Sequence, residues 1–173
     1  IRSCGTCHFC SQGDKVQCNS VFPLDEQSPL RTSDGELIKH GLRTAAFAES
    51  VVVDSSQVAP IPKEIPLDSA SVLSCGVITG FGAVVNTAKI QSGCSVVVMG
   101  TGGVGLNSVQ GSSIAGAESI IALDLADEKL EAAKNFGATH TVNVSREKPT
   151  KAVYGITEGR GADYVFVTVG DKN

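Results

Sequence analysis

The 173-residue sequence lacks the features that would direct it to nucleic acid or to a membrane. It has no block of lysine and arginine and a formal net charge of −4, whereas a surface that binds phosphate backbones usually carries a basic patch. No apolar run approaches the roughly 20 residues that a membrane-spanning helix needs. We therefore expect a globular protein whose partner is a small molecule, with neither a nucleic-acid nor a membrane partner.

An initiator methionine and a signal peptide are also lacking at the first residue, Ile1, so we expect the chain to begin inside a longer protein. The six cysteines are not spread through the chain as they are in a disulfide scaffold. Four of them lie within residues 4–18, whereas Cys75 and Cys94 lie in apolar, glycine-rich surroundings. This clustering indicates metal binding in a reducing compartment, and we expect a cytoplasmic protein.

The pattern of the chain changes near residue 67. Residues 1–45 are irregular, and the β-branched run Val51–Val53 predicts a strand within 47–59. Asp68 is a candidate helix N-cap, and a second helix is expected at about 79–88. Beyond these, short apolar runs predict strands at 94–99, 119–123, 140–144 and 163–169. The stretches between them predict helices at 105–115, 127–136 and 148–158. This alternation predicts an α/β fold with a parallel sheet.

Four cysteines follow the spacing C-x2-C-x2-C-x7-C, at Cys4, Cys7, Cys10 and Cys18. Four thiolates that converge on one point make a closed tetrahedral site, which is the arrangement of structural zinc. A polar loop without its own hydrophobic core is the kind of segment that a metal stabilises. Disulfides and an iron–sulfur site are the alternatives, although the ferredoxin spacing places three residues, rather than seven, before the last cysteine.

The glycine-rich segment after the first predicted strand fits G-x-G-x-x-G, with glycines at 100, 102 and 105. In such a segment Gly100 permits a tight turn, Gly102 lets the backbone approach a pyrophosphate, and Gly105 lets the helix pack close to the sheet. The phosphates are expected at the helix N-terminus. The strand before this loop and the helix after it make the motif more specific than the glycines alone.

An acidic residue, Asp124, stands nineteen residues after Gly105, at the end of the next predicted strand. A carboxylate there accepts hydrogen bonds from both hydroxyls of an adenosine ribose and repels a 2′-phosphate, and Leu125 offers no compensating charge. The motif therefore predicts NAD rather than NADP as the cofactor. The alternative for Asp124 is an ordinary helix N-cap.

With these motifs identified, the chain resembles the zinc-containing medium-chain alcohol dehydrogenases, in particular the glutathione-dependent formaldehyde dehydrogenase-like branch. The resemblance extends over nearly the whole chain through CGTCHFC, SCGVITGFGAVVNTAKIQSG, VVVMGTGGVGL and ALDLADEKLEAAKNFGATHTVN. It implies part of a β-rich, GroES-like catalytic domain at 1–76, with a structural zinc lobe at about 1–33. A Rossmann-type NAD-binding domain, incomplete at its C-terminus, would follow at 77–173.

Several site residues are implied by the resemblance rather than by the motifs. Cys75 matches a ligand of the catalytic zinc, and Thr79 matches the residue beside the nicotinamide ring. Lys129 matches a ribose-contacting lysine, and Gly103 and Val104 complete the pyrophosphate loop. Without the resemblance, Cys75 would be interpreted as a core thiol and Lys129 as a solvated side chain. Cys94 matches no functional position.

The resemblance also implies what this chain does not itself supply. The family's other catalytic-zinc ligands come from segments upstream of the cysteine lobe, and neither His40 nor His140 lies in the family's Gly-His-Glu setting. Pocket-side residues are expected around 41–47, but the substrate is not readable. The complete protein is expected to be a homodimer or homotetramer.

The predicted function is NAD-linked, zinc-dependent oxidation of a primary alcohol or a hydroxymethyl adduct to an aldehyde-level product, or the reverse. One alternative is an NAD-binding fragment that catalyses nothing. A second is a quinone or enoyl reductase of the same superfamily without catalytic zinc, although most such proteins lack the four-cysteine lobe. A zinc-stapled interaction module is a third.

Overall fold

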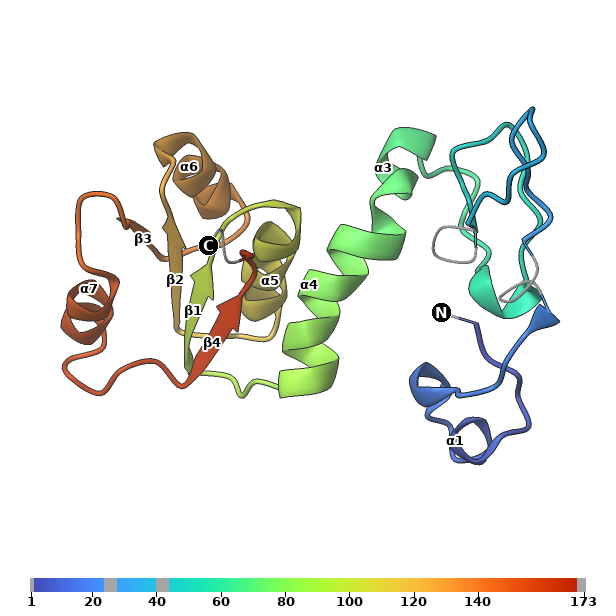
Figure 1. The fold of residues 1–173 in the computed structure, drawn as a ribbon. Coiled ribbons are helices and arrows are strands. Elements are labelled where there is room, and N and C mark those ends of the chain that lie inside the picture. The colour runs from blue at the N-terminus through green and yellow to red at the C-terminus, as the bar shows by residue number, and fades with distance from the viewer. Residues whose placement is uncertain (1, 24–27, 40–43, 171–173) are drawn as a thin grey trace. The chain divides into compact units, whose positions relative to one another are not determined.

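A computed structural model describes residues 2–23, 28–39 and 44–170, and the chain divides into two compact units, residues 1–63 and 64–173. The ribbon is drawn in Figure 1. The second unit starts before the predicted domain boundary at 76/77, so that Cys75 belongs to the same unit as the sheet. The unit boundary follows packing, whereas the predicted boundary followed the resemblance.

The second unit contains a parallel sheet whose strands are ordered β3-β2-β1-β4. These strands are β1 (Ser95–Met99), β2 (Ser119–Asp124), β3 (His140–Asn143) and β4 (Tyr164–Val167). Adjacent strands pair in parallel throughout. The two central strands, β1 and β2, are buried on both faces, because their β-branched residues pack on helices above and below. The predicted α/β sheet is confirmed, with boundaries within a few residues of those expected.

Helices cover both faces of this sheet (Figure 1). One core joins alternate residues of β1 and β2 to α5 (Gly103–Ile114) and α6 (Asp127–Asn135), whereas the other joins the intervening residues to α7 (Pro149–Ile156). The α6 helix ends before Gly137, whose φ of +107° closes the turn into β3. Among the described residues, no helix is long and apolar enough to cross a membrane.

A run of helical segments precedes the sheet, made of α3 (Leu67–Ser71), the π-helical turn η4 (Leu73–Val77), α4 (Ile78–Gly82) and the π-helical turn η5 (Ala83–Ala88). Its α4 helix packs closely on α5, since a Cβ at Gly80 would overlap the Val104 carbonyl and lie 2.9 Å from the Ser108 nitrogen. The prediction that Asp68 is the N-cap is wrong. Pro66, whose ψ of 139° lies outside the helical region, is the N-cap, and Asp68 lies in the first turn.

In its described residues the first unit is irregular, as predicted for residues 1–45. Its described elements are short: α1 (His8–Ser11), the 3-10 turns η1 (Lys15–Gln17) and η3 (Ser55–Gln57), and one isolated bridge between Arg31 and Leu37. The strand predicted within 47–59 is absent from the structure. Val52 is 82% exposed in this segment. A β-branched run forms a stable strand only when a neighbouring strand pairs with it, and among the described residues no strand pairs with this run. The β-rich character of the first domain stays a prediction.

The close packing of α5 on the glycine loop makes a stability prediction. A methyl group at Gly105 would overlap the Gly100 carbonyl oxygen and lie 2.8 Å from the Thr168 hydroxyl, whereas one at Gly103 meets nothing within 4 Å. We expect Gly105→Ala to lower the free energy of unfolding by about 1–3 kcal/mol. The matched control Gly103→Ala should change it by less than about 1 kcal/mol. Urea unfolding measures both, and equal effects would contradict this account of the packing.

Candidate metal and nucleotide sites

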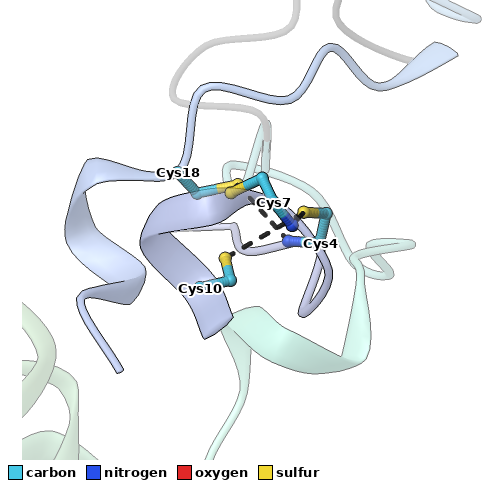
Figure 2. A group of neighbouring side chains, drawn as sticks. All are labelled: Cys4, Cys7, Cys10 and Cys18. Atoms are coloured by element: carbon cyan, nitrogen blue, oxygen red, sulfur yellow. Dashed lines mark hydrogen bonds between the residues drawn. The ribbon is translucent and has the colours of Figure 1, made fainter. Parts of the chain in front are cut away.

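The four clustered cysteines converge in the first unit, as Figure 2 shows. Every pair of their sulfur atoms lies within 4.8 Å, with 4.0 Å between Cys4 and Cys10 and 3.9 Å between Cys7 and Cys18. Sulfurs around a tetrahedral zinc, at Zn–S distances of about 2.3 Å, are separated by roughly 3.8 Å. The separations in the structure are therefore close to those of a metal-bound set.

Local backbone geometry brings these sulfurs together. Cys7 is the N-cap of α1, Cys10 lies within that helix, and Cys18 follows η1. Backbone N–H groups point at the sulfurs: Cys7 donates to the Cys4 sulfur over 3.2 Å, and Cys4 donates to the Cys18 sulfur over 3.4 Å. Such N–H···S bonds stabilise thiolates and orient them, as outer-shell partners do in metal sites.

The thiols differ in how readily they ionise. The hydrogen bond from the Ser20 side chain, followed by those from the Thr6 and Cys7 backbone, lowers the pKa of Cys4 to about 5. Backbone hydrogen bonds from Ser20 and Cys4 also lower the pKa of Cys18, whereas burial raises that of Cys10 to about 11. A bound cation is needed to keep Cys10 ionised beside the other thiolates. The set thus fits a thiolate-binding divalent metal such as zinc.

The alternatives for this cluster fare differently. All four cysteines are unpaired in the structure, which agrees with a metal site rather than a disulfide pair. Among the described residues, the group of potential metal donors consists of these four cysteines and does not include His8, which lies between Cys7 and Cys10 in the sequence. Against the iron–sulfur alternative stands the gap of seven residues before Cys18, where the ferredoxin spacing has about three.

The glycine loop joins β1 to α5 in the second unit. Gly100 has a φ of +90°, a conformation that favours glycine, and a Cβ there would overlap Val169. Gly102 is the N-cap of α5, and a Cβ at Gly102 or Gly103 would meet nothing within 4 Å. The start of α5, whose first N–H groups have no partner within the helix, is therefore open to an approaching anion.

Asp124 lies at the end of β2 and is held by four hydrogen bonds. Its Oδ2 accepts from the backbone N–H (2.8 Å) and the hydroxyl (3.1 Å) of Thr101, and its Oδ1 accepts from the backbone N–H groups of Leu125 (2.8 Å) and Ala126 (3.1 Å). Burial raises the pKa of Asp124, but these hydrogen bonds outweigh burial and hold the pKa below its usual value. The carboxylate is therefore charged at neutral pH. It is not an N-cap, because Ala126 caps α6.

Thr101 was not predicted as a site residue. It occupies a variable position of the glycine fingerprint, and its side chain is almost completely buried. The sequence places a hydroxyl residue shortly after the first predicted strand, but only the pairing of that strand with the one ending in Asp124 shows that the two residues meet. Parallel pairing of Met99 with Leu123 brings Thr101 and Asp124 together at the same sheet edge.

A hollow of about 660 Å³ lies at the carboxyl ends of the strands, and Asp124 and Lys129 both line it. Lys129 places its Nζ 4.0 Å from the Asp124 carboxylate, but its side chain is 56% exposed, so the ion pair is weak. Strand order reverses between β1 and β4, and open parallel sheets bind ligands at this point. The full lining is Met99, Gly100, Leu123, Asp124, Leu125, Lys129, Val144, Val167, Val169 and Gly170.

Cys75 and Thr79 lie on the helical run that packs against α5. Cys75 is exposed on η4, and Thr79 is exposed on α4. A Cβ at Gly76 would lie 3.8 Å from the Gly103 carbonyl carbon, so this segment borders the start of α5. Among the described residues, Cys75 belongs to no group of three or more potential metal donors.

The histidines and the pocket-side residues complete the set of predicted positions. His140 begins β3, is exposed and hydrogen-bonds Thr139 over 2.9 Å, so its predicted place in a strand is confirmed. His40 lies outside the described residues, as does the 41–43 part of the stretch expected to face the substrate. A largely apolar hollow of about 740 Å³ lies in the first unit and is lined by Pro29, Leu30, Ile38, Lys39, Thr44, Ala45, Phe47, Ala48, Ser50, Val51 and Val52.

Comparisons with known proteins agree with this fold and these motifs. Residues 103–173 match the family described as zinc-binding dehydrogenase. The class-3 alcohol dehydrogenase of Zea mays is 38% identical over 97% of this chain, and the class-3 enzyme of Oryza sativa subsp. japonica is 37% identical. The chain spans about half the length of these curated relatives, 46% in each case.

Solved structures give the same result. An alcohol dehydrogenase zinc-binding domain protein from Burkholderia ambifaria matches 99% of this chain with a TM-score of 0.87 and 35% identity. Benzyl alcohol dehydrogenase from Acinetobacter calcoaceticus matches 99% with a TM-score of 0.85 and 30% identity. The chain covers 48% of each. Over the part of these relatives that it spans, the chain is similar to zinc-containing alcohol dehydrogenases, in agreement with the resemblance seen in the sequence.

The cysteine geometry makes a metal-binding prediction. We expect Cys10→Ser to remove about one zinc ion per chain, because a closed structural site requires all four ligands. Residues 1–63 should then lose hydrogen-exchange protection while the sheet keeps it. Cys94→Ala, which removes a buried thiol outside the cluster, is the control and should retain the metal. Elemental analysis measures the metal, and an unchanged zinc content in Cys10→Ser would refute the assignment of this site.

Proposed function

We propose that this chain supplies the NAD-binding site and the structural zinc site of an enzyme that oxidises a primary alcohol or a hydroxymethyl adduct to an aldehyde-level product, or catalyses the reverse. The observation that carries the proposal is the charged Asp124 carboxylate lining a hollow beside an open, glycine-bounded helix start. The relatives, named as alcohol dehydrogenases, supply the reaction class. The hydroxymethyl adduct and the branch of the family rest on the sequence resemblance.

The residues of the second unit divide the work of holding NAD. The open N–H groups at the start of α5, beside Gly102, Gly103 and Val104, face the pyrophosphate. Asp124 accepts from the adenosine ribose, and Lys129, which lines the same hollow with its Nζ 4.0 Å from the Asp124 carboxylate, reaches the ribose hydroxyls. A 2′-phosphate would bring further negative charge against the Asp124 carboxylate, and the neighbouring Leu125 offers no positive charge. These roles favour NAD over NADP.

The structural zinc site is supported by a complete set of ligands, whereas the catalytic zinc site is supported by one. The cluster of Cys4, Cys7, Cys10 and Cys18 fits a structural zinc in its number of ligands, its separations and its ionisation. Cys75 offers one ligand to a catalytic zinc, which needs three protein ligands and an open position. The described residues do not form that set, so no reaction step is assigned to them. Thr79, one helical turn from Cys75, lies where it would contact the nicotinamide ring by the resemblance.

A catalytic zinc held in part by Cys75 would supply Lewis-acid chemistry at the alcohol oxygen, and NAD would be the hydride acceptor. The contribution of this chain to that chemistry is position. The glycine loop holds the pyrophosphate and Asp124 holds the adenosine ribose at the sheet edge. The segment that carries Cys75 and Thr79 borders the same helix start, which supports a metal ligand close to the bound cofactor.

A second candidate is an NAD-binding chain without turnover. It is favoured by one observation, that Cys75 belongs to no donor group among the described residues. Zinc per chain, measured together with NADH formation from a primary alcohol, separates the two. Two zincs with turnover support the enzyme, whereas one zinc, NAD binding and no turnover support the second candidate. Assembly as a homodimer or homotetramer is proposed for the complete protein only.

Asp124 provides the sharpest test of the cofactor site. We expect Asp124→Ala to weaken NAD binding by roughly tenfold to a hundredfold, because a charged acceptor of ribose hydrogen bonds is lost. Zinc content should be unchanged, since the cysteine cluster lies in the other unit. Glu131→Ala, which removes an exposed carboxylate from α6, the helix that follows Asp124, is the control and should bind NAD normally. Calorimetric titration measures both, and equal NAD affinity in Asp124→Ala would end the ribose assignment.

A further inference from the structure

Every acceptor position of the Asp124 carboxylate is already used. A carboxylate has about four lone-pair sites, and four donors occupy them here: the Thr101 N–H, the Thr101 hydroxyl, and the N–H groups of Leu125 and Ala126. A ribose brings one or two further hydroxyl donors to the same two oxygens. A ribose therefore cannot bind Asp124 in full without displacing a donor that is present in the structure.

The four donors are not equally free to leave. Three are backbone N–H groups, fixed by the glycine loop and by the turn between β2 and α6. The fourth is the Thr101 hydroxyl, at 3.1 Å, which turns about a side-chain bond while the backbone stays in place. It is also the donor whose loss leaves the backbone bond from Thr101 to the same oxygen intact.

We propose that the Thr101 hydroxyl holds the ribose-binding position of Asp124 in the ligand-free protein and is exchanged for a ribose hydroxyl when an adenine dinucleotide binds. The inference rests on the proposed NAD site and makes Thr101 an affinity-determining residue for it. Exchange has a cost, because the Thr101 side chain is 1% exposed and its displaced hydroxyl loses a charged acceptor in a buried place. Cofactor affinity is thus set below the value that Asp124 alone would give.

The substitutions Thr101→Val and Thr101→Ser separate this exchange from simple packing. Valine keeps the shape of threonine and removes the competing donor, whereas serine keeps the donor. We expect Thr101→Val to bind ADP and NAD about threefold to tenfold more tightly than the wild type, and Thr101→Ser to bind them as the wild type does. If Thr101 merely supported the loop, Thr101→Val would bind ADP and NAD more weakly than the wild type.

Paired nucleotides show whether the gain passes through the ribose hydroxyls. The gain in Thr101→Val should appear with ADP and vanish with 2′,3′-dideoxy-ADP, which brings no diol to Asp124. In the ligand-free protein, the pKa of Asp124, followed by carboxylate NMR, should rise in Thr101→Val and stay in place in Thr101→Ser, because only valine removes a donor from the carboxylate.

The outcomes are distinguishable. Tighter ADP binding in Thr101→Val, absent for the dideoxy nucleotide, supports the exchange. Unchanged or weaker ADP binding in Thr101→Val, or an equal change for both nucleotides, overturns the exchange while leaving the NAD site standing. Failure of the wild type to bind either NAD or ADP overturns the proposed function and the exchange together.

Discussion

The nucleotide site depends on one backbone contact, the approach of α5 to the carbonyl of Gly100 at Gly105. This approach is possible only without a side chain at Gly105, and it aims the start of α5 at the carboxyl edge of the sheet. The same loop places Thr101 beside the end of β2, where it binds Asp124. Helix start, glycine loop and acid are thereby held as one arrangement rather than as three independent features.

The metal lobe is organised by a different kind of interaction. Its helices are one turn long and its described backbone is irregular, so burial alone gives little to hold it. Four converging sulfurs, supported by N–H donors, offer a closed site that a divalent metal would tie together. The second unit is instead held together by hydrophobic packing, in two cores that cover the two faces of the sheet.

The parts of this fold that could be predicted from sequence are those in which local pattern and tertiary environment agree. Runs such as SVVVM and SIIALD are apolar enough to be buried on both faces, and they became central strands. Val51–Val53 carries the same β-branched signal, but strand formation depends on a partner that local sequence does not reveal. The N-cap at Asp68 failed because Pro66 already marks the helix start.

The site followed the same logic. Cysteine spacing and glycine fingerprint report local geometry, so the sulfur cluster and the loop were predictable. Thr101 was missed because its contact with Asp124 joins two strands, and no local pattern contains that pair. Cys75 and Thr79 were identified only by resemblance, since on a helical run an exposed cysteine and threonine carry no chemical signal of their own.

The most direct test of the central claim, that Asp124 makes this edge of the sheet an NAD site, is a competition titration of NAD against NADP on the zinc-loaded protein. We expect NAD to bind at least about tenfold more tightly, because a 2′-phosphate would bring further negative charge against the Asp124 carboxylate. Equal affinities, or a preference for NADP, would contradict the account.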